Sequence, residues 1–322
     1  MSKKKLILGV DVSKKKLDVV VLGETKLTTI YKKFNNTPLG FEKIIDFISK
    51  NNPFNLEVVL GLESTGIYQV AISNYLVSKG VTVYLLNPNQ VLNFKRYKGW
   101  LAKTDKIDSF VIAKFIEASE NDLVKYIPKS NTEKKLYSYV VRIDQLNKIR
   151  TQEINHKESS FLVLEEVEKH ILELSEKIEE YKKSLSLLLK TKENQELLEK
   201  VEVLTSIKGI AVFTAVSILV FMSEIGTMNR KQITALTGLA PLANDSGSKN
   251  GQRHIYGGRK RLRRALFMPS LSAMTNDKIL NEVYKRLDER GKPGYKIRVV
   301  IMKKMIIRAN TLMKEYYKNK AA

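Results

Sequence analysis

The stretch that decides the N-terminal fold is Ile7-Leu8-Gly9-Val10-Asp11-Val12-Ser13, followed directly by "KKKLDVVVL". The pattern predicts a β-strand, a short polar turn and a second β-strand. Asp11 stands among Ile, Leu and Val, where an ionised carboxylate is costly to bury unless a partner compensates its charge. Asp11 is therefore either a residue at a strand end that caps the turn, or one ligand of a metal site whose other members lie far along the chain.

The composition of the chain points to a polyanionic partner. At roughly 150 residues per domain, the 322 residues are enough for about two domains. The hydrophobic fraction of 43% supplies ordinary buried cores. Lys and Arg number 56 against 34 Asp and Glu, which gives a formal net charge of +22. Such an excess favours binding to nucleic acid or to an anionic membrane.

Features that the sequence lacks narrow the choice between nucleic acid and membrane and restrict the kind of metal site. No apolar run approaches the roughly 18–20 residues of a membrane span, and the basic N-terminus runs into a strand without a signal-peptide pattern. Nucleic acid is therefore the expected partner and the cytoplasm the expected location. The chain has no cysteine and only three widely spaced histidines, which excludes thiolate sites and disfavours zinc. Any metal would be held by oxygen ligands.

The first region, residues 1–127, has the pattern of an α/β domain. Helices are predicted near 38–50, 67–79 and 105–118, and strands at 6–12, 17–22, 56–62 and 81–86. Strands followed by alternating strands and helices indicate a mixed sheet with helices on its faces.

The middle region, residues 128–200, has a different periodicity. From Leu164 to Leu188 the apolar side chains recur at alternating steps of three and four, which is an a/d heptad seam. An earlier helix has apolar side chains between Leu136 and Leu146. The pattern predicts a long antiparallel or dimerising coiled coil, and the alternative is a helical pair packed on its own domain.

The last region, residues 201–322, is predicted to be mostly α-helical. The segment "TSIKGIAVFTAVSIL" resembles a helix-hairpin-helix with Lys208 and Gly209 in its turn. In that motif, backbone N–H groups at the start of the second helix contact a phosphate without reading the base sequence. An ordinary tight turn between two helices is the alternative.

A glycine-rich loop at residues 241–264 contains Ser246 and Ser248 and ends in a basic run. Glycines permit close approach of the backbone to a ligand, and a serine there could attack a phosphodiester. The segment Asn244-Asp245-Ser246-Gly247 is equally typical of a turn, and local chemistry alone favours the turn. The basic run suits phosphates and consists of Arg259, Lys260, Arg261, Arg263 and Arg264.

Three further acids stand where a metal site could use them. Glu63 follows an apolar strand at its C-terminal end, where ligands bind in open α/β sheets, and Asp105 and Asp108 project from one face of a helix start. Each has a local alternative, as a helix N-cap or as a favourable charge at a helix N-terminus. Together with Asp11, they suggest a site for hard divalent cations such as Mg²⁺. Two such ions, roughly 4 Å apart, can activate a nucleophile and stabilise the leaving oxygen in phosphodiester cleavage.

Several ordered segments together resemble the IS-one-ten family of bacterial insertion-sequence transposases. One departure is Lys231 after Arg230, where the family often has Phe after Arg. The segments that carry the resemblance are "GVDVSKKKLDVVVL", "LESTGIYQVAISNYLVSKGVTVYLLNP", "KTDKIDSFVIAKFI", "SIKGIAVFTA", "LTGLAPLANDSG" and "GGRKRLRRALF".

The resemblance implies a fold and a set of catalytic residues. The N-terminal domain would be RNase H-like, similar to the RuvC Holliday-junction resolvase, and a coiled coil would join it to a C-terminal serine transposase domain. The nucleophile would be Ser246, with Ser248 as the alternative. The Asp-Glu-Asp-Asp set that would bind Mg²⁺ or Mn²⁺ falls on Asp11, Glu63, Asp105 and Asp108.

The resemblance also implies an activity and partners. Family members are DNA recombinases that act on double-stranded donor and target DNA, are guided by a noncoding bridge RNA, and assemble as a dimer of dimers with composite active sites. Two other hypotheses are a metal-dependent resolvase-like nuclease without serine catalysis and a nucleic-acid-binding protein without catalysis. Contacts to nucleic acid are expected from Lys208, Gly209, Arg259, Lys260, Arg261, Arg263 and Arg264.

Overall fold

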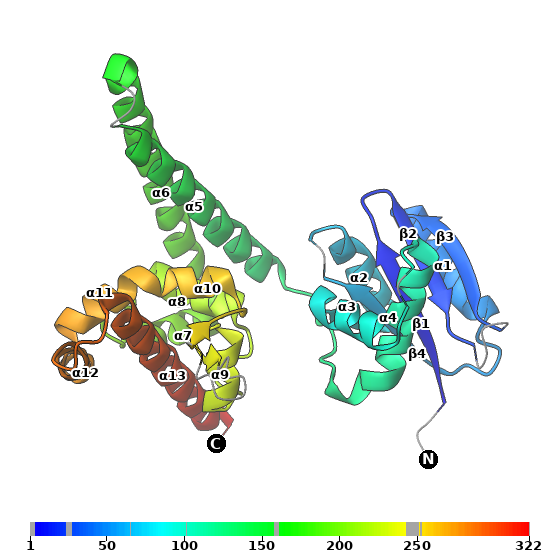
Figure 1. Ribbon diagram of the computed structural model, residues 1–322. Helices are drawn as coiled ribbons and strands as arrows, with labels where there is room; N and C mark the ends of the chain where they lie inside the picture. The colour runs from blue at the N-terminus through cyan, green and yellow to red at the C-terminus, as the bar shows by residue number, and fades with distance from the viewer. Residues whose placement is uncertain are drawn as a thin grey trace. The chain divides into compact units, whose positions relative to one another are not determined.

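The computed structural model divides into two compact units, residues 1–129 and residues 130–322 (Figure 1). The long helical pair of the middle region lies in the second unit together with the C-terminal helices. A division into three domains at residues 127 and 200 remains a prediction. The structure describes residues 4–23, 28–64, 66–100, 102–157, 161–242, 251 and 253–321.

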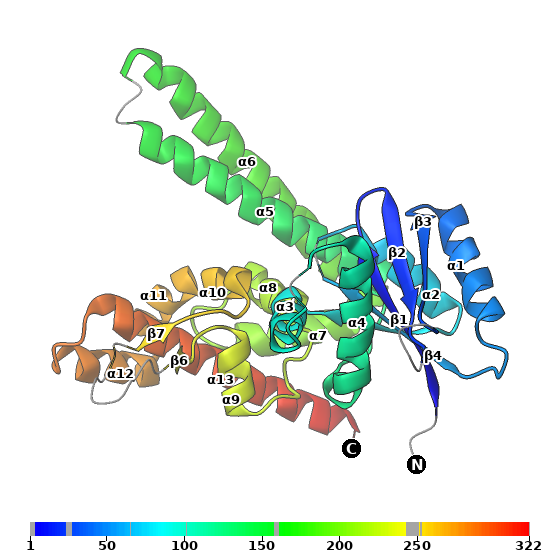
Figure 2. The same cartoon turned by 45° about the vertical axis from the view of Figure 1, so that its right-hand side comes forward.

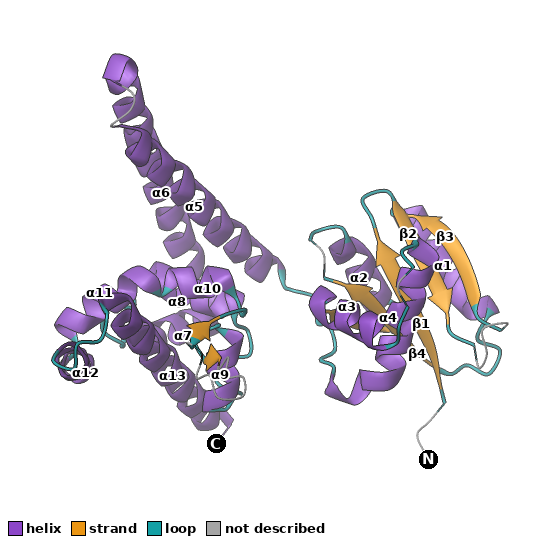
Figure 3. Ribbon diagram, viewed as in Figure 1, coloured by secondary structure: helices purple, strands orange, loops and turns teal. Residues whose placement is uncertain are grey.

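The first unit is built on a five-stranded mixed sheet in the order β3-β2-β1-β4-β5 (Figure 3). β1 pairs antiparallel with β2 and parallel with β4, so the predicted mixed α/β sheet is confirmed. β3, an edge strand that pairs with β2, was not predicted. The strands are β1 (Lys5–Val12), β2 (Lys16–Val21), β3 (Ile30–Asn35), β4 (Glu57–Glu63) and β5 (Thr82–Leu86).

Helices cover both faces of this sheet. On one face, buried side chains such as Leu8 and Leu60 form a core with Ile44 and Ile72 of the first two helices. On the other face, Val59 packs against the fourth helix. The helices are α1 (Pro38–Lys50), α2 (Gln69–Ser78), α3 (Pro88–Tyr97) and α4 (Asp105–Ser119), and a short 3-10 turn η1 (Glu120–Asp122) follows.

Two glycines allow α4 to lie directly on the sheet. A Cβ atom at Gly9 of β1 would clash with the backbone carbonyl oxygen of Ser109, and one at Gly61 of β4 would clash with the side chain of Ile116. Any larger residue at Gly9 would push the helix backbone away from the strand. The glycines therefore bring the start of α4 close to the ends of β1 and β4.

In the second unit, α5 (Asn131–His156) and α6 (Leu164–Leu189) form an antiparallel hairpin (Figure 2). Arg150 donates to the hydroxyl of Ser175, and the rings of Tyr139 and Tyr181 lie 5.9 Å apart, so early residues of α5 face late residues of α6. The middle of the heptad seam, at Leu174 and Ile178, is buried against Ile143 and Leu146 of the same chain. The predicted long antiparallel pair of helices is thus confirmed within one chain, and self-association through the hairpin stays a prediction.

The remaining helices form the core of the second unit, which confirms its mostly α-helical character. The short strands β6 (Pro241–Leu242) and β7 (His254–Ile255) pair with each other. No helix of the described residues is long and apolar enough to span a bilayer. The helices are η3 (Phe161–Val163), η4 (Lys192–Asn194), α7 (Gln195–Thr205), α8 (Val212–Phe221), α9 (Arg230–Leu236), α10 (Lys260–Ala265), α11 (Phe267–Asn276), α12 (Lys278–Asp288) and α13 (Gly294–Ala321).

Candidate active site

Two of the predicted site residues stand at the C-terminal ends of neighbouring parallel strands. Asp11 is the penultimate residue of β1 and Glu63 the last residue of β4. Val10 pairs with Leu62, so Asp11 and Glu63 are the next residues of the two strands in the same register. Because side chains alternate along a strand, both carboxylates point to the face that α4 covers. Each is half-buried.

The other two predicted acids stand in the first turn of α4. Thr104 is the N-cap, and its hydroxyl accepts a hydrogen bond from the N–H of Ile107. Asp105 is the first helical residue and Asp108 lies one turn later, so the alternative that Asp105 is the N-cap is wrong. Both aspartates favour the positive end of the helix dipole. The same positions place them on the side of the sheet where Asp11 and Glu63 point.

The pKa values of the strand-end acids show that these carboxylates interact. Burial raises the pKa of the Asp11 carboxyl, and the charges of Asp108 and Asp105 raise it further. Burial also raises the pKa of Glu63, to which the charges of Asp11 and Asp108 add. The structure thus brings the four predicted acids into one region in which each repels its neighbours.

A lysine that the sequence analysis missed lies among these acids. Nζ of Lys95 on α3 lies 2.5 Å from Oδ1 of Asp108, and only 12% of the lysine side chain is exposed. Its charge lowers the pKa of Glu63, against the effect of burial. The signal was weak because α3 is short, polar overall and buries only Val91.

A second missed residue is Asp18 of β2, which pairs with Asp11 in the antiparallel register. Its side chain is 4% exposed. The hydroxyl of Tyr31 donates a hydrogen bond to Oδ1 of Asp18 at 2.5 Å, and Nζ of Lys33 lies 3.7 Å from the same oxygen. Asp18 is therefore a buried acid with its own partners beside the candidate site. Its position between the apolar residues Leu17 and Val19 was the only signal for it.

The donor set agrees in its chemistry with a hard divalent cation. Four carboxylates with little compensating charge attract such an ion, and carboxylate oxygens are the ligands that Mg²⁺ and Mn²⁺ prefer. Within the described parts of the chain, no three Asp, Glu, His or Cys side chains stand close enough together to hold a metal ion as they are. One reason is visible at Asp108, whose oxygen is engaged by Lys95.

The raised pKa values predict that Asp11 destabilises the metal-free protein at neutral pH. A carboxyl whose pKa is higher in the folded state loses folding free energy as the pH rises from its ordinary value near 4 through the raised value. We therefore expect Asp11→Asn to raise the melting temperature in EDTA at pH 7.5, with the difference disappearing near pH 3.

Thermal melting of wild type and variant between pH 3 and pH 8 measures this effect. Asp122→Asn is the matched control, since Asp122 is exposed in η1. A difference between wild type and Asp11→Asn that stays constant over the whole pH range would contradict the assignment to carboxylate repulsion.

In the second unit, the two ends of the glycine-rich loop are tied together. Leu242 of β6 pairs with His254 of β7. Gly238 and Gly258 touch through their backbones, and both have positive φ angles, +68° and +63°, that favour glycine. Arg263 donates to the carbonyl oxygens of Gly238 and Gly257. Ser246 and Ser248, the candidate nucleophiles, lie outside the described residues.

The basic run after the loop has protein partners that the sequence did not predict. Both terminal nitrogens of Arg259 donate to the carboxylate of Glu224, at 2.6 and 2.7 Å. Arg264 donates to both oxygens of Asp144 on α5, and the guanidinium of Arg261 lies 5.8 Å from the ring centre of Phe221. These arginines therefore stabilise the fold of the second unit in addition to contributing positive charge. Contacts of the run with nucleic acid stay a prediction.

The predicted helix-hairpin-helix turn joins α7 to α8. Gly209 has φ +92°, and a Cβ atom there would lie 2.6 Å from the carbonyl oxygen of Pro269. The glycine is thus required by the close approach of α11. Lys208 beside it is exposed. Phosphate binding by this turn stays a prediction.

Comparisons with known proteins identify the family. Residues 8–167 match the DEDD transposase domain of IS110 elements, and residues 201–285 match the domain described as "Transposase IS116/IS110/IS902 family". The chain belongs to the IS110 family of transposases. IS110 transposases are enzymes of DNA strand cleavage and transfer, so the predicted recombinase class is confirmed. The DEDD domain implies a carboxylate metal site in this chain.

Relatives of the chain agree with this assignment. It is 26% identical over 307 residues to the pilin gene-inverting proteins of Moraxella bovis and Moraxella lacunata, which covers 94% of this chain and 94% of each relative. It is 34% identical over 93 residues to an uncharacterized 43.6 kDa protein of insertion element IS110 from Streptomyces coelicolor, 28% of this chain and 23% of that protein.

Proposed function

We propose that this IS110 transposase cuts and rejoins the DNA strands of an insertion sequence through a carboxylate metal site and a nucleophilic serine, guided by a noncoding bridge RNA. The metal ligands are Asp11, Glu63, Asp105 and Asp108, and the nucleophile is Ser246. The observation that carries the proposal is the shared register of β1 and β4, which directs Asp11 and Glu63 toward the first turn of α4.

In the proposed site, the four carboxylates would hold Mg²⁺ or Mn²⁺. The bound ion would supply positive charge to the oxygens of the scissile phosphodiester. Lys95 lies beside Asp108 and adds a fixed cation to the same region. Asp18, held by Tyr31, fixes the end of β2 next to Asp11.

The serine step is a transesterification. The oxygen of Ser246 forms a bond to phosphorus while one deoxyribose oxygen leaves and takes up a proton in place of the one that the serine loses. The number of phosphoester bonds is unchanged, so a free DNA hydroxyl reverses the step and releases the serine. Because no phosphoester bond is lost in the step, the mechanism favours rejoining of strands over hydrolysis.

Two features support nucleic-acid partners and self-association. The net charge of +22 favours long polyanions such as DNA and RNA. At the far end of the α5–α6 hairpin, Leu162 and Leu172 are 93% and 60% exposed. Exposed apolar side chains of this kind suit contact with a second copy, in line with the proposed dimer and dimer of dimers. The extensive similarity to proteins named for pilin gene inversion supports recombination as the activity.

The guide RNA is tested by purification of the full chain from cells that carry its natural flanking DNA. We expect one structured noncoding RNA to co-purify, and recombination of donor and target plasmids to require it. Changing the guide segments of that RNA should redirect recombination to new sites. The Asp11→Asn variant is the control, because it should retain the RNA without recombining. Undiminished recombination after removal of all RNA would refute the guided mechanism.

A further inference from the structure

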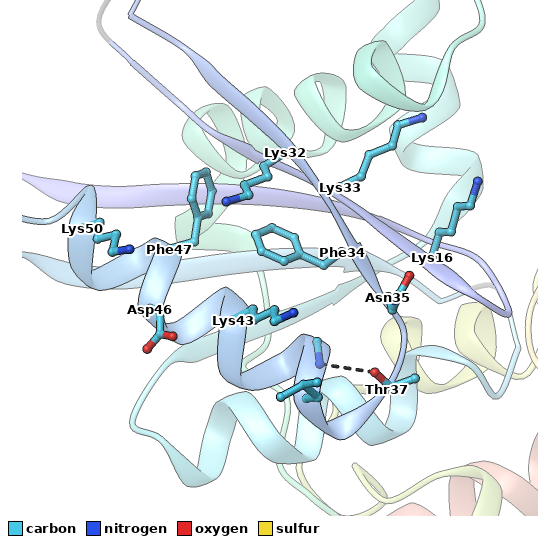
Figure 4. A pocket seen from close by; sticks show the side chains of 12 residues that line it. Lys16, Lys32, Lys33, Phe34, Asn35, Thr37, Lys43, Asp46, Phe47 and Lys50 are labelled. Carbon is cyan, nitrogen blue, oxygen red and sulfur yellow. Dashed lines mark hydrogen bonds between the residues drawn. The ribbon is translucent and has the colours of Figure 1, made fainter.

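A groove lies between the edge strand β3 and helix α1, and the family assignment does not account for it. It has a volume of about 530 Å³, and Figure 4 shows the side chains that line it. Five lysines and a single carboxylate, Asp46, line it. We call it the lysine groove, after Lys16, Lys32, Lys33, Lys43 and Lys50.

The local structure explains why lysines gather there. Along β3, Lys32 and Phe34 are two residues apart and so share a face, and Phe34 packs against Phe47 with ring centres 5.5 Å apart. Nζ of Lys32 lies 5.6 and 5.7 Å from the centres of these two rings. Along α1, Lys43 and Lys50 are seven residues apart and lie on the same face. The buried rings of Phe34 and Phe47 thus form the base of the groove, and lysine side chains line its sides.

Most of this charge is not neutralised by the protein. Lys33 is the exception, because its side chain points to the opposite face of the sheet, where Nζ lies 3.7 Å from Oδ1 of Asp18. Lys16, Lys43 and Lys50 are exposed, and none of the three has an ion-pair partner within the described ranges of the chain. Lys32, Lys43 and Lys50 lie on the α1 side of the sheet around the rings of Phe34 and Phe47, with Asp46 as the one carboxylate that lines the groove. Their like charges repel one another, so an anionic ligand that spans them would be attracted strongly.

The chemistry of the groove favours phosphates over bases. Phe34 and Phe47 are only 7% and 8% exposed, so their rings offer no stacking platform for unpaired bases. The hydroxyl of Thr37 is occupied as the N-cap acceptor of α1. Lysine ammoniums are point charges that bind phosphate without geometric selectivity. Lys43 and Lys50 are separated by roughly 10 Å along the helix axis, so the two ammonium groups can contact different phosphates of a duplex.

We propose that the lysine groove binds the sugar–phosphate backbone of double-stranded DNA without reading its sequence. The proposal rests on the proposed function for its ligand, since a recombinase must hold duplex DNA. The groove lies over the α1 side of the sheet, whereas Asp11 and Glu63 point to the α4 side. Its role would be to hold DNA, and it adds no group to the carboxylate site.

The test is duplex binding by the full chain in EDTA, measured at several salt concentrations with a 30-base-pair DNA of arbitrary sequence. For the double variant Lys43→Ala/Lys50→Ala, the loss of two phosphate contacts should lower affinity near 0.1 M salt by roughly 10- to 100-fold. The slope of log affinity against log salt should fall by about 1.8. The charge-preserving variant Lys43→Arg/Lys50→Arg should bind as the wild type does.

The matched control is Lys79→Ala/Lys125→Ala, which removes two exposed lysines of the same unit outside the groove. An equal loss in this control, or no loss in the groove variant, would overturn the proposal. A single-stranded RNA of the same length is the second probe, and weakened RNA binding with unchanged DNA binding would also overturn it. Because no cleavage is measured, failure of the groove is distinguishable from failure of the carboxylate or serine assignments.

Discussion

Replacing Asp11, Glu63, Asp105 or Asp108 by its amide is expected to lower recombination on the order of 100-fold or more in each case. The amide keeps the size of the side chain but removes the negative charge that a divalent cation needs. The fold should survive, because the four side chains are exposed or only half-buried. The paired assay is recombination of a reporter plasmid together with thermal melting of each variant.

A titration with Mg²⁺ separates loss of the metal from loss of the fold. Binding to the folded state alone raises the melting temperature of the wild type with ion concentration. The four amide variants should show a smaller rise, and the control Asp122→Asn the full rise. Full recombination activity in any two of the four variants would exclude the shared carboxylate site.

Ser246→Ala is expected to abolish the covalent protein–DNA adduct while RNA and DNA binding persist. A serine hydroxyl is a poor nucleophile at neutral pH unless its proton is removed or its alkoxide is stabilised. The carboxylate site and the basic residues after the loop are the groups proposed to supply that help. Ser246→Cys should keep a trace of activity, since a thiolate attacks phosphorus but suits a site built for serine poorly.

The adduct is trapped on labelled DNA, the protein is denatured, and the modified peptide is identified by mass spectrometry. Ser248→Ala, two residues away on the same loop, is the matched control and should form the adduct normally. An adduct on Ser248 would move the nucleophile by two residues. Recombination that proceeds without any serine adduct would leave strand cleavage to the carboxylates.

The regular elements of the first unit were predictable because their apolar periodicity is complete. β1, β2, β4 and β5 are buried strands, and their positions agree with the predicted ranges to within a few residues. β3 was missed because only Phe34 of its six residues is buried, which hides the alternation. α3 was missed for the same reason, since Val91 is its one buried residue. Elements that bury few side chains lack the apolar periodicity by which buried strands and helices are predicted.

The candidate site was partly predictable. Asp11 and Glu63 were candidates because each is an acid beside an apolar strand, but grouping them with Asp105 and Asp108 depended mainly on the resemblance to the transposase family. Lys95 was not, because its importance depends on the approach of α3 to α4, a tertiary contact that no local spacing encodes. The ion pairs of Arg259 with Glu224 and of Arg264 with Asp144 were unpredictable for the same reason, since the partners are remote in the sequence.

The pairing of β6 with β7 has a consequence for how this protein could change over time. Leu242 and His254 are held opposite each other, so the chain between them enters and leaves at fixed points. Doubling the length of such a closed segment costs only about 0.6 kcal/mol of loop entropy. Insertions and deletions between these anchors are thus nearly neutral for stability. Descendants of this element can therefore differ in the number of residues around the proposed nucleophile while the paired anchors hold the helices on either side in place.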